Sequence, residues 1–296
     1  MAALAKKISK VNWPARRIQV LQGASLRKIP WLIHGFSTRT GGFTSVYGKE
    51  KTLNLSFTKE DSRPTVEKNR KAFLRSLGAS EWPLIALRQI HSDIVHVVKS
   101  SNPSQLTGDG LVTSVPGLML AIQTADCLPV ILADTRNKAI GVFHAGWRGT
   151  IKRIVEKGLG IMRCEYGSMP EDITAAIGPG IQKCCYEVGQ ELKDQFESQF
   201  EYGQLLFHEV FTPDPVREKY PLLFMNMRAP GHGDWGPKLH LDLTEANRRQ
   251  LLSAGVLESH ITTLGHCTSC GTRRFFSHRA EKGTTGRMMA VAGIRK

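Results

Sequence analysis

The chain has 296 residues, of which 41% are hydrophobic and 22% charged, enough to bury a substantial core in one large domain or two smaller ones. No apolar run approaches the roughly 20 residues that span a bilayer, and the basic start of the chain lacks the apolar region of a secretory signal. The net charge of +14 is spread over short clusters without an aromatic-rich RNA-binding motif. It therefore predicts attraction for anionic substrates rather than specific nucleic-acid binding, in a cytoplasmic protein that does not enter a membrane.

The expected elements alternate between strands and helices. Residues 1–30 are basic and predict an irregular or edge segment, and residues 31–296 predict one mixed α/β domain without internal repeat or linker. Short apolar runs predict strands at 31–36, 84–87, 94–98, 118–122, 128–133, 139–143, 173–177, 261–264, 275–279 and 287–291. Helical spacing and capping residues predict helices at 62–77, 150–162, 188–200 and 241–254. Residues 37–42 predict a polar loop, and residues 201–237 a long irregular surface segment.

The most informative stretch runs from 123 to 149. Its two apolar runs, 128–133 and 139–143, flank a segment with turn character, so they predict a hairpin. Cys127 precedes the first run and His144 follows the second, so the hairpin would bring both to one end. The small residues around Trp147 and Arg148 suit the close approach of a ligand.

Three interpretations of this stretch remain open from the residues alone. With His91, which precedes another strand-like run, Cys127 and His144 make a His-Cys-His set that suits catalytic zinc with an open fourth position, and also admits copper. A buried cysteine beside two hydrogen-bonded histidines explains the same residues equally well. In a third interpretation Cys127 is a nucleophile activated by His144, with Asp126 or Asp93 orienting the imidazole, as in a metal-free hydrolase.

Six cysteines occur without an export signal. We therefore expect a protein of the reducing cytoplasm, without a framework of disulfides. Cys267 and Cys270 form a single Cys-x-x-Cys pair. A structural zinc site there would need two more ligands at suitable spacing, and none is evident in the sequence. We therefore expect a small packed role without redox function for this pair.

Several charged residues beside glycines are further candidates. Arg39, Arg148 and Arg287 suit phosphate or carboxylate recognition, although each taken singly is more simply a solvated surface residue. Asp126 and Asp109 are candidates for acid–base chemistry or for orienting a ligand, and Asp109 is equally suited to forming a turn.

Over about residues 31–294 the chain resembles the laccase-domain proteins, also called multicopper polyphenol oxidoreductase-like proteins and, more recently, a purine nucleoside phosphorylase and adenosine deaminase family. The resemblance is specific because many uncommon strings occur in the family's order. They are HGFSTRTGG at 34–42, NR at 69–70, QIHS at 89–92, GDG at 108–110, TADCLP at 124–129, HAGWRG at 144–149, IGPGI at 177–181, CYE at 185–187, LDL at 241–243, FFSHR at 275–279 and TGR at 285–287.

The resemblance implies a single mixed-sheet layered α/β domain related to the catalytic domain of cytotoxic necrotizing factor, which is a Cys-His hydrolase. It implies that His91, Cys127 and His144 bind one zinc or copper ion. It also implies phosphorolysis of adenosine, inosine and methylthioadenosine, with deamination of adenosine. The alternatives are a metal-free Cys-His hydrolase or amidase and a polyphenol oxidoreductase, although the chain lacks the paired His-x-His strings of four-copper oxidases.

On this basis the expected partners are purine nucleosides and phosphate, in a monomer or small homo-oligomer. We expect Asp126, Cys127 and Arg148 to be catalytic, with Asp126 handling protons. The expected substrate contacts are Arg39, Gly42, Asn54, Trp147 and Arg148. His278 stands where the family often has tyrosine, and residues 201–237 are longer than usual, so both are expected to alter the pocket edge and the substrate preference.

Overall fold

The computed structural model describes residues 17–103, 105–211, 219 and 237–296. Most of the expected basic N-terminal segment and much of the expected surface segment at 201–237 lie outside these residues. In the described part of the chain, no helix combines the length and the apolar character that a bilayer crossing requires.

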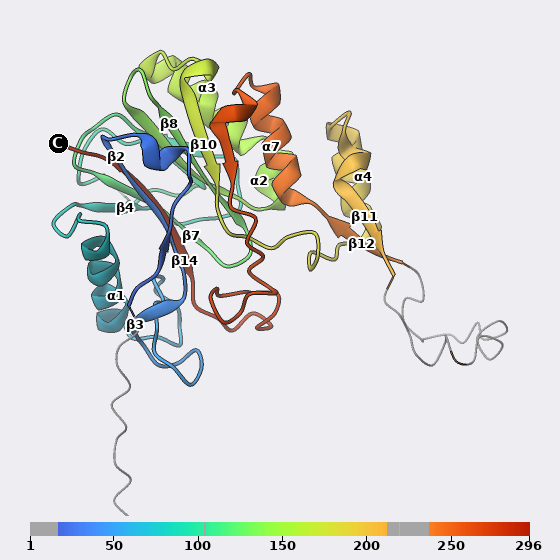
Figure 1. Cartoon of the computed structure of the whole chain (residues 1–296), viewed down its shortest axis with the longest axis horizontal. Helices are drawn as coiled ribbons and strands as arrows, with labels where there is room; N and C mark the ends of the chain where they lie inside the picture. The colour runs from blue at the N-terminus through green and yellow to red at the C-terminus, as the bar shows by residue number, and fades with distance from the viewer. Residues whose placement is uncertain (1–16, 104, 212–218, 220–236) are drawn as a thin grey trace, which may run out of the picture.

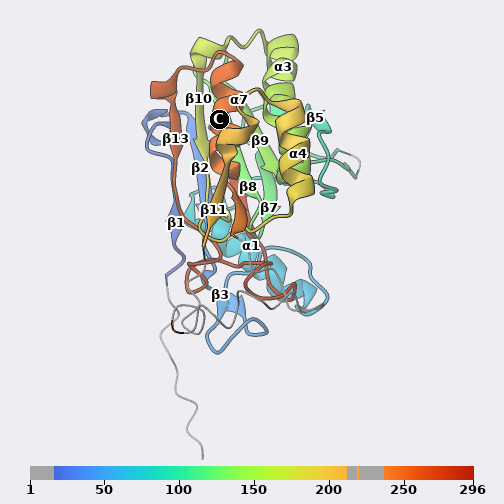
Figure 2. The same ribbon diagram turned by 90° about the vertical axis from the view of Figure 1, so that its right-hand side faces the viewer.

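Two β-sheets stack face to face, and helices cover their outer faces (Figures 1 and 2). The first sheet has the order β1 (Val20–Leu21), β2 (Leu32–Ser37), β14 (Met288–Ile294), β7 (Met119–Thr124) and β4 (Leu84–Ala86). The second has the order β13 (Ile261–Thr263), β10 (Ile173–Ile177), β8 (Leu128–Asp134), β9 (Ala139–Ala145), β6 (Gly110–Thr113) and β5 (Val95–Val97). A two-stranded sheet joins β11 (Phe207–Val210) to β12 (Lys238–Leu241), and β3 (Thr40–Thr44) forms bridges to Thr52. The mixed α/β architecture is therefore confirmed.

The helices flank the two sheets on opposite sides. Helix α1 (Arg63–Ser76) begins where the Ser62 side chain accepts the N–H of Thr65, and its Phe73 packs against the first sheet. The second sheet is covered by α2 (Trp147–Ile151), α3 (Ile154–Tyr166) and α7 (Leu243–Ser253), while α4 (Gln190–Gln199) lies farther from the sheet, next to α2 (Figure 1). Short 3-10 turns are η1 (Leu26–Lys28), η2 (Pro170–Asp172), η3 (Gly203–Leu206) and η4 (Glu258–His260).

The hairpin expected near the middle of the chain is confirmed as β8 and β9, paired antiparallel. Both strands are buried along their whole length, between the first sheet on one side and the helices on the other. A strand that is buried on both faces needs apolar residues at successive positions, which is why its sequence shows continuous apolar runs. This hairpin lies at the centre of the molecule.

Four expected elements differ. Residues 203–210, within the segment expected to be irregular, form the 3-10 turn η3 and the strand β11, which pairs with β12. The strand predicted at 275–279 is wrong: Phe275 and Phe276 are buried in turns, against Tyr47 and Met288, so their apolar character reflects packing and not sheet pairing. The loop predicted at 37–42 becomes strand from Thr40. The helix predicted at 150–162 is divided into α2 and α3, because Arg153 adopts a left-handed φ of 60° between them.

Candidate metal centre and substrate pocket

Cys127 and His144 meet at one end of the hairpin. The register pairs Leu128 with Ala145 and Pro129 with His144. Cys127 directly precedes Leu128, so it lies at the same end of the hairpin as His144. His91 reaches the same place from the segment between β4 and β5. The ligand atoms of the three side chains all lie within 4.8 Å of one another, and the two imidazole ring centres are 4.9 Å apart. The predicted convergence of these three residues is therefore present.

Asp109 orients His144. Its Oδ1 lies 2.7 Å from Nδ1 of His144, and both side chains are buried. A carboxylate on one imidazole nitrogen fixes the ring and leaves the other nitrogen for a metal or a reacting group. The sequence interpretation assigned this role to Asp126 or Asp93, which is wrong. Asp93 instead forms ion pairs with Lys152 and Lys157.

The same carboxylate also shapes the segment that carries His91. The N–H groups of Ile90, His91 and Ser92 donate to Asp109 over 3.2, 3.1 and 2.6 Å, and the Ser92 hydroxyl donates over 2.7 Å. His91 has a φ of 58°, a left-handed conformation that is unfavourable for a residue with a side chain. The hydrogen bonds to Asp109 hold the backbone in this conformation, so one buried carboxylate positions both histidines.

The charges of the centre support one another. Burial alone would raise the pKa of Cys127, but attraction and hydrogen bonding from His144 and His91 lower it to about 6. Burial alone would lower the pKa of His144, but Cys127 and Asp109 raise it to about 9. Burial would likewise raise the pKa of Asp109, and hydrogen bonds from His144 and Ser92 lower it to about 2. The protein therefore favours a thiolate at Cys127, which is the form that binds metals.

The donor set fits one zinc or copper ion. A thiolate and two imidazoles are ligands that both metals accept, and three protein ligands leave a further position open. Gly146 makes the compact arrangement possible, because a Cβ atom there would lie 3.0 Å from the Cys127 sulfur and 3.4 Å from Cδ2 of His91. His91 is exposed on one side, so the centre is accessible.

The centre opens into a pocket of about 840 Å³, a size typical of small-molecule sites. Among the described residues that line it, one acidic side chain, Asp126, faces several cations. Aromatic and amide side chains complete the wall. The lining includes Phe57, Arg70, Arg88, Gln89, Gln123, Trp147, Tyr186, His278, Arg279 and Arg287. Such a lining suits a ligand that combines a flat ring with an anionic group.

Asp126 lies in this wall next to Cys127. Its φ of 93° is left-handed, and its carboxylate accepts hydrogen bonds from the Thr268 hydroxyl over 2.6 Å and from the Arg279 N–H over 2.7 Å. These contacts explain how the strained backbone is held. The role of Asp126 in proton handling stays a prediction.

Of the predicted substrate residues Trp147 and Arg148, only the first lines the pocket. Arg148 is exposed and lies 4.1 Å above the Trp147 ring centre, outside the lining residues. The string HAGWRG therefore contributes a ring to the wall, while its arginine stacks on that ring.

Arg39, Gly42 and Asn54 do not line this pocket. The Arg39 guanidinium is buried, donates to the carbonyls of Tyr47 and Thr272, and pairs with Glu281 at 2.9 Å. These partners hold its N–H groups within the protein, and Arg39 lines a different pocket together with Tyr47 and Glu281. The contact of Arg39 with a substrate stays a prediction.

Gly42 and Asn54 hold backbone segments together. A Cβ atom on Gly42 would lie 2.6 Å from the carbonyl oxygen of Thr52, and the φ of Gly42 is 84°, so this position requires glycine. Asn54 is buried, and its Oδ1 accepts the N–H of Arg287 over 3.0 Å. Asn54 thus positions a pocket residue without lining the pocket.

The sequence interpretation missed Arg70, Arg88, Arg279 and Tyr186 as pocket residues. They come from four separate segments, so no local spacing connects them. The strings NR at 69–70, CYE at 185–187 and FFSHR at 275–279 contained three of the four, and those strings were the available signal.

The description Multi-copper polyphenol oxidoreductase laccase belongs to the family model that matches residues 33–295. A protein of Deinococcus radiodurans named purine nucleoside phosphorylase is 37% identical over 265 residues, which cover 88% of each chain. The purine nucleoside phosphorylase YlmD of Geobacillus stearothermophilus is 35% identical, covering 89% of this chain and 90% of that one. A protein named adenosine deaminase RL5, from an unknown prokaryotic organism, is 32% identical over 266 residues, covering 86% and 91% of the two chains.

Solved structures share the fold. The hypothetical protein YfiH of Bacillus licheniformis superimposes with a TM-score of 0.77 at 28% identity, covering 97% of this chain and 98% of that one. The crystal structure of YlmD from Geobacillus stearothermophilus gives a TM-score of 0.74 at 31% identity, covering 96% and 100%. The chain belongs to the multi-copper polyphenol oxidoreductase (laccase) family, and it is similar to proteins named purine nucleoside phosphorylase and adenosine deaminase.

Proposed function

We propose that this protein is a metal-dependent purine nucleoside phosphorylase that acts on adenosine, inosine and methylthioadenosine, and that it also deaminates adenosine. The proposal rests on one observation: His91, Cys127 and His144 line a pocket that is rich in arginine and aromatic side chains. The names of the relatives support the same chemistry. We also propose that residues 31–296 act as one catalytic domain related to that of cytotoxic necrotizing factor.

The pocket offers separate surfaces for the parts of the substrates. Trp147, Tyr186 and Phe57 provide rings against which a purine can stack. Gln89 is held by the backbone of Gln123, to which it donates over 2.8 Å and from which it accepts over 2.7 Å. It therefore presents a fixed wall beside the ligand.

The phosphate is assigned to pocket arginines rather than to Arg39. Arg70 donates to the Leu55 carbonyl over 2.8 Å, and Arg287 donates to the carbonyls of Thr285 and Gly286. These bonds fix the side chains in advance of binding, which reduces the entropy lost when phosphate is held. Arg88 and Arg279 add positive charge to the same wall.

In phosphorolysis a phosphate oxygen attacks the anomeric carbon, the glycosidic bond breaks, and its electron pair leaves with the purine, which takes up a proton. Arginines orient the phosphate, and Asp126 is the proposed carrier of the proton. A zinc or copper ion held by His91, Cys127 and His144 would supply Lewis-acid polarisation at this place. Asp109 keeps the Nδ1 of His144 occupied, so that the imidazole faces the centre.

A second candidate follows from one specific contact. Cys127, His144 and Asp109 lie in the order of a nucleophile, a base and an orienting acid, which would suit a metal-free hydrolase or amidase. The position of His91 against the same sulfur favours metal binding instead, because a hydrolytic triad needs only one histidine.

The deciding experiment incubates purified protein with inosine in the presence and absence of phosphate. We expect hypoxanthine and ribose 1-phosphate only when phosphate is present, loss of turnover after metal removal, and recovery on adding zinc or copper. Adenosine should in addition yield ammonia and inosine. The Cys127→Ala variant should lose the ion of this centre and turnover together, whereas Cys164→Ala, which alters an exposed cysteine on α3, should keep both. Release of base without phosphate, or turnover that survives metal removal, would contradict the proposal.

A further inference from the structure

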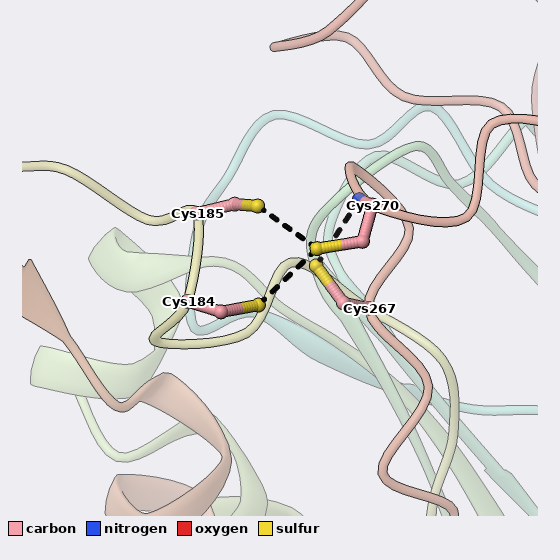
Figure 3. Close-up of side chains that lie close together, drawn as sticks. All are labelled: Cys184, Cys185, Cys267 and Cys270. Carbon is pink, nitrogen blue, oxygen red and sulfur yellow. Dashed lines mark hydrogen bonds between the residues drawn. The ribbon is translucent and has the colours of Figure 1, made fainter.

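Four cysteines from two distant parts of the chain converge outside the pocket. Cys184 and Cys185 lie on the segment that follows β10, and Cys267 and Cys270 on the segment that follows β13 (Figure 3). All four sulfur atoms lie within 4.8 Å of one another. The Cys270 sulfur is 3.4 Å from that of Cys184 and 3.2 Å from that of Cys185. We propose that these four cysteines bind one structural zinc ion, separate from the centre at Cys127.

The distances suit a single tetrahedral ion. With zinc–sulfur bonds of 2.3 Å, the sulfurs of a regular tetrahedron lie about 3.8 Å apart, within the range spanned by this cluster. The close grouping leaves no room for several irons with their bridging sulfides. Four thiolates also select zinc over harder cations such as magnesium or calcium.

The arrangement does not match a pair of disulfides. All four cysteines are free. The Cys270 sulfur approaches both Cys184 and Cys185, and one sulfur cannot bond to two others. Convergence of several sulfurs on one point is what a shared ion requires.

The backbone holds the two segments in position for such a site. Strands β10 and β13 are parallel neighbours, with Ile177 opposite Thr263, so their following segments leave the sheet side by side. Gly180 then continues the pairing beyond the strands, donating to the His266 carbonyl over 3.2 Å and accepting from the Thr268 N–H over 3.1 Å. The N–H of Cys270 points to the Cys267 sulfur at 3.5 Å, a contact that favours a thiolate.

Basic residues adjoin both cysteine pairs in the sequence. A zinc ion with four thiolates carries a net charge of about −2, which nearby cations stabilise. Lys183 precedes the first pair and forms an ion pair with Asp242 at 3.2 Å, and Arg273 and Arg274 follow the second pair. The sequence showed no additional ligands for the CxxC pair, but the tertiary structure places Cys184 and Cys185 beside it. Under this proposal the pair binds a metal instead of having the small packed role without redox function that the sequence suggested.

The position of the cluster suggests what the ion does. One segment continues into Ile181 and Tyr186, and the other leads to Arg279, all of which line the pocket. Both segments also touch Asp126: its carbonyl accepts from the Ile181 N–H over 2.8 Å, and its carboxylate accepts from Thr268. Four protein ligands leave no open position, which is typical of structural zinc. The ion would tie together the two segments that form this side of the pocket.

Metal analysis of protein purified with a reducing agent tests the proposal without any activity measurement. We expect the wild type to hold two ions per chain and Cys127→Ala to keep one, since this variant leaves the cluster intact. The double variant Cys267→Ser/Cys270→Ser should lose one ion. Cys164→Ser, which alters an exposed cysteine on α3, should keep both. A Cys127→Ala protein that is folded but binds no zinc would overturn the proposal.

Cobalt provides a second readout on the same Cys127→Ala protein. Cobalt in a four-thiolate site should give the intense visible absorption of tetrahedral thiolate coordination, and removing the metal should lower Tm by several degrees. A weak spectrum typical of hydrated cobalt, or disulfides among these cysteines in protein isolated without air, would show that the cluster is not a metal site. The inference does not rest on the proposed enzymatic function, so the two can fail independently.

Discussion

Asp109 Oδ1 lies 2.7 Å from His144 Nδ1, and neither side chain has significant contact with solvent. The same carboxylate accepts hydrogen bonds from three successive N–H groups around His91. One aspartate therefore places two of the three candidate metal ligands, which come from segments more than 50 residues apart in the chain. The geometry of the candidate metal centre therefore depends on this residue as well as on the ligands.

Replacement of Asp109 by asparagine should weaken metal binding by about 10- to 100-fold, because the amide cannot accept every hydrogen bond that the carboxylate accepts. Metal affinity measured by competition with a chelator checks this. Asp134→Asn is the matched control. Asp134 is equally buried, but it accepts the N–H groups of Arg136 and Asn137 at the turn between β8 and β9, away from Cys127. An equal loss of affinity in both variants would indicate a general effect on folding.

Gly146→Ala should reduce metal content and turnover while the protein remains folded. The added Cβ would lie 3.0 Å from the Cys127 sulfur, closer than a carbon and a sulfur normally approach, so the ligands must move apart. Gly160→Ala in α3 is the control, because nothing lies within 4 Å of its added Cβ. That change should stabilise the helix by about 0.5–1 kcal/mol. Metal analysis and thermal unfolding of both variants test whether only Gly146→Ala loses metal. Full metal content in Gly146→Ala would refute the prediction.

Arg287→Gln should raise the KM for phosphate by roughly tenfold or more, since a hydrogen bond to a charged group contributes about 1.5–3 kcal/mol. The KM for the nucleoside should change less. Arg148→Gln should have the smaller effect on phosphate, because Arg148 lies outside the pocket lining and stacks on Trp147. Steady-state kinetics with phosphate as the varied substrate decide between them. A larger effect at Arg148 would restore the role that the sequence suggested for it.

His34 should make the fold sensitive to mild acid. Burial lowers its pKa to about 4, and its Nε2 accepts the Gly23 N–H over 3.1 Å, which a protonated nitrogen cannot do. Between pH 4 and 6.5 the His34 imidazole is protonated in the unfolded chain but not in the folded chain. The contribution of neutral His34 to the free energy of unfolding is therefore complete above pH 6.5 and is lost as the pH falls towards 4. The loss is on the order of 3 kcal/mol.

The measurement is the free energy of unfolding in urea at pH 5 and pH 7 for the wild type and His34→Gln. Subtracting the two proteins isolates His34, because all other titrating groups are common to both. The wild type should lose more stability between the two pH values than the variant. Identical pH dependence in the two proteins would mean that His34 is protonated without cost in the folded state.

Several elements were predictable from local pattern. The β8–β9 hairpin follows from two continuous apolar runs around a turn, and α1 follows from Ser62 and the early proline. Pairing within a hairpin is local, so the meeting of Cys127 and His144 followed as well. The buried turns at Phe275 and Phe276 were not predictable, because an apolar run does not reveal whether packing or strand pairing buries it.

The sequence by itself determined the alternation of strands and helices, the hairpin, the three candidate ligands and the family strings. Only the tertiary structure decided that Asp109 rather than Asp93 or Asp126 orients His144, that Arg39 pairs with Glu281 away from the pocket, and that Cys184 and Cys185 face Cys267 and Cys270. The physical reason is the same in each case. These contacts join segments that are distant in the chain, and their geometry depends on how the two sheets stack and how β10 and β13 pair.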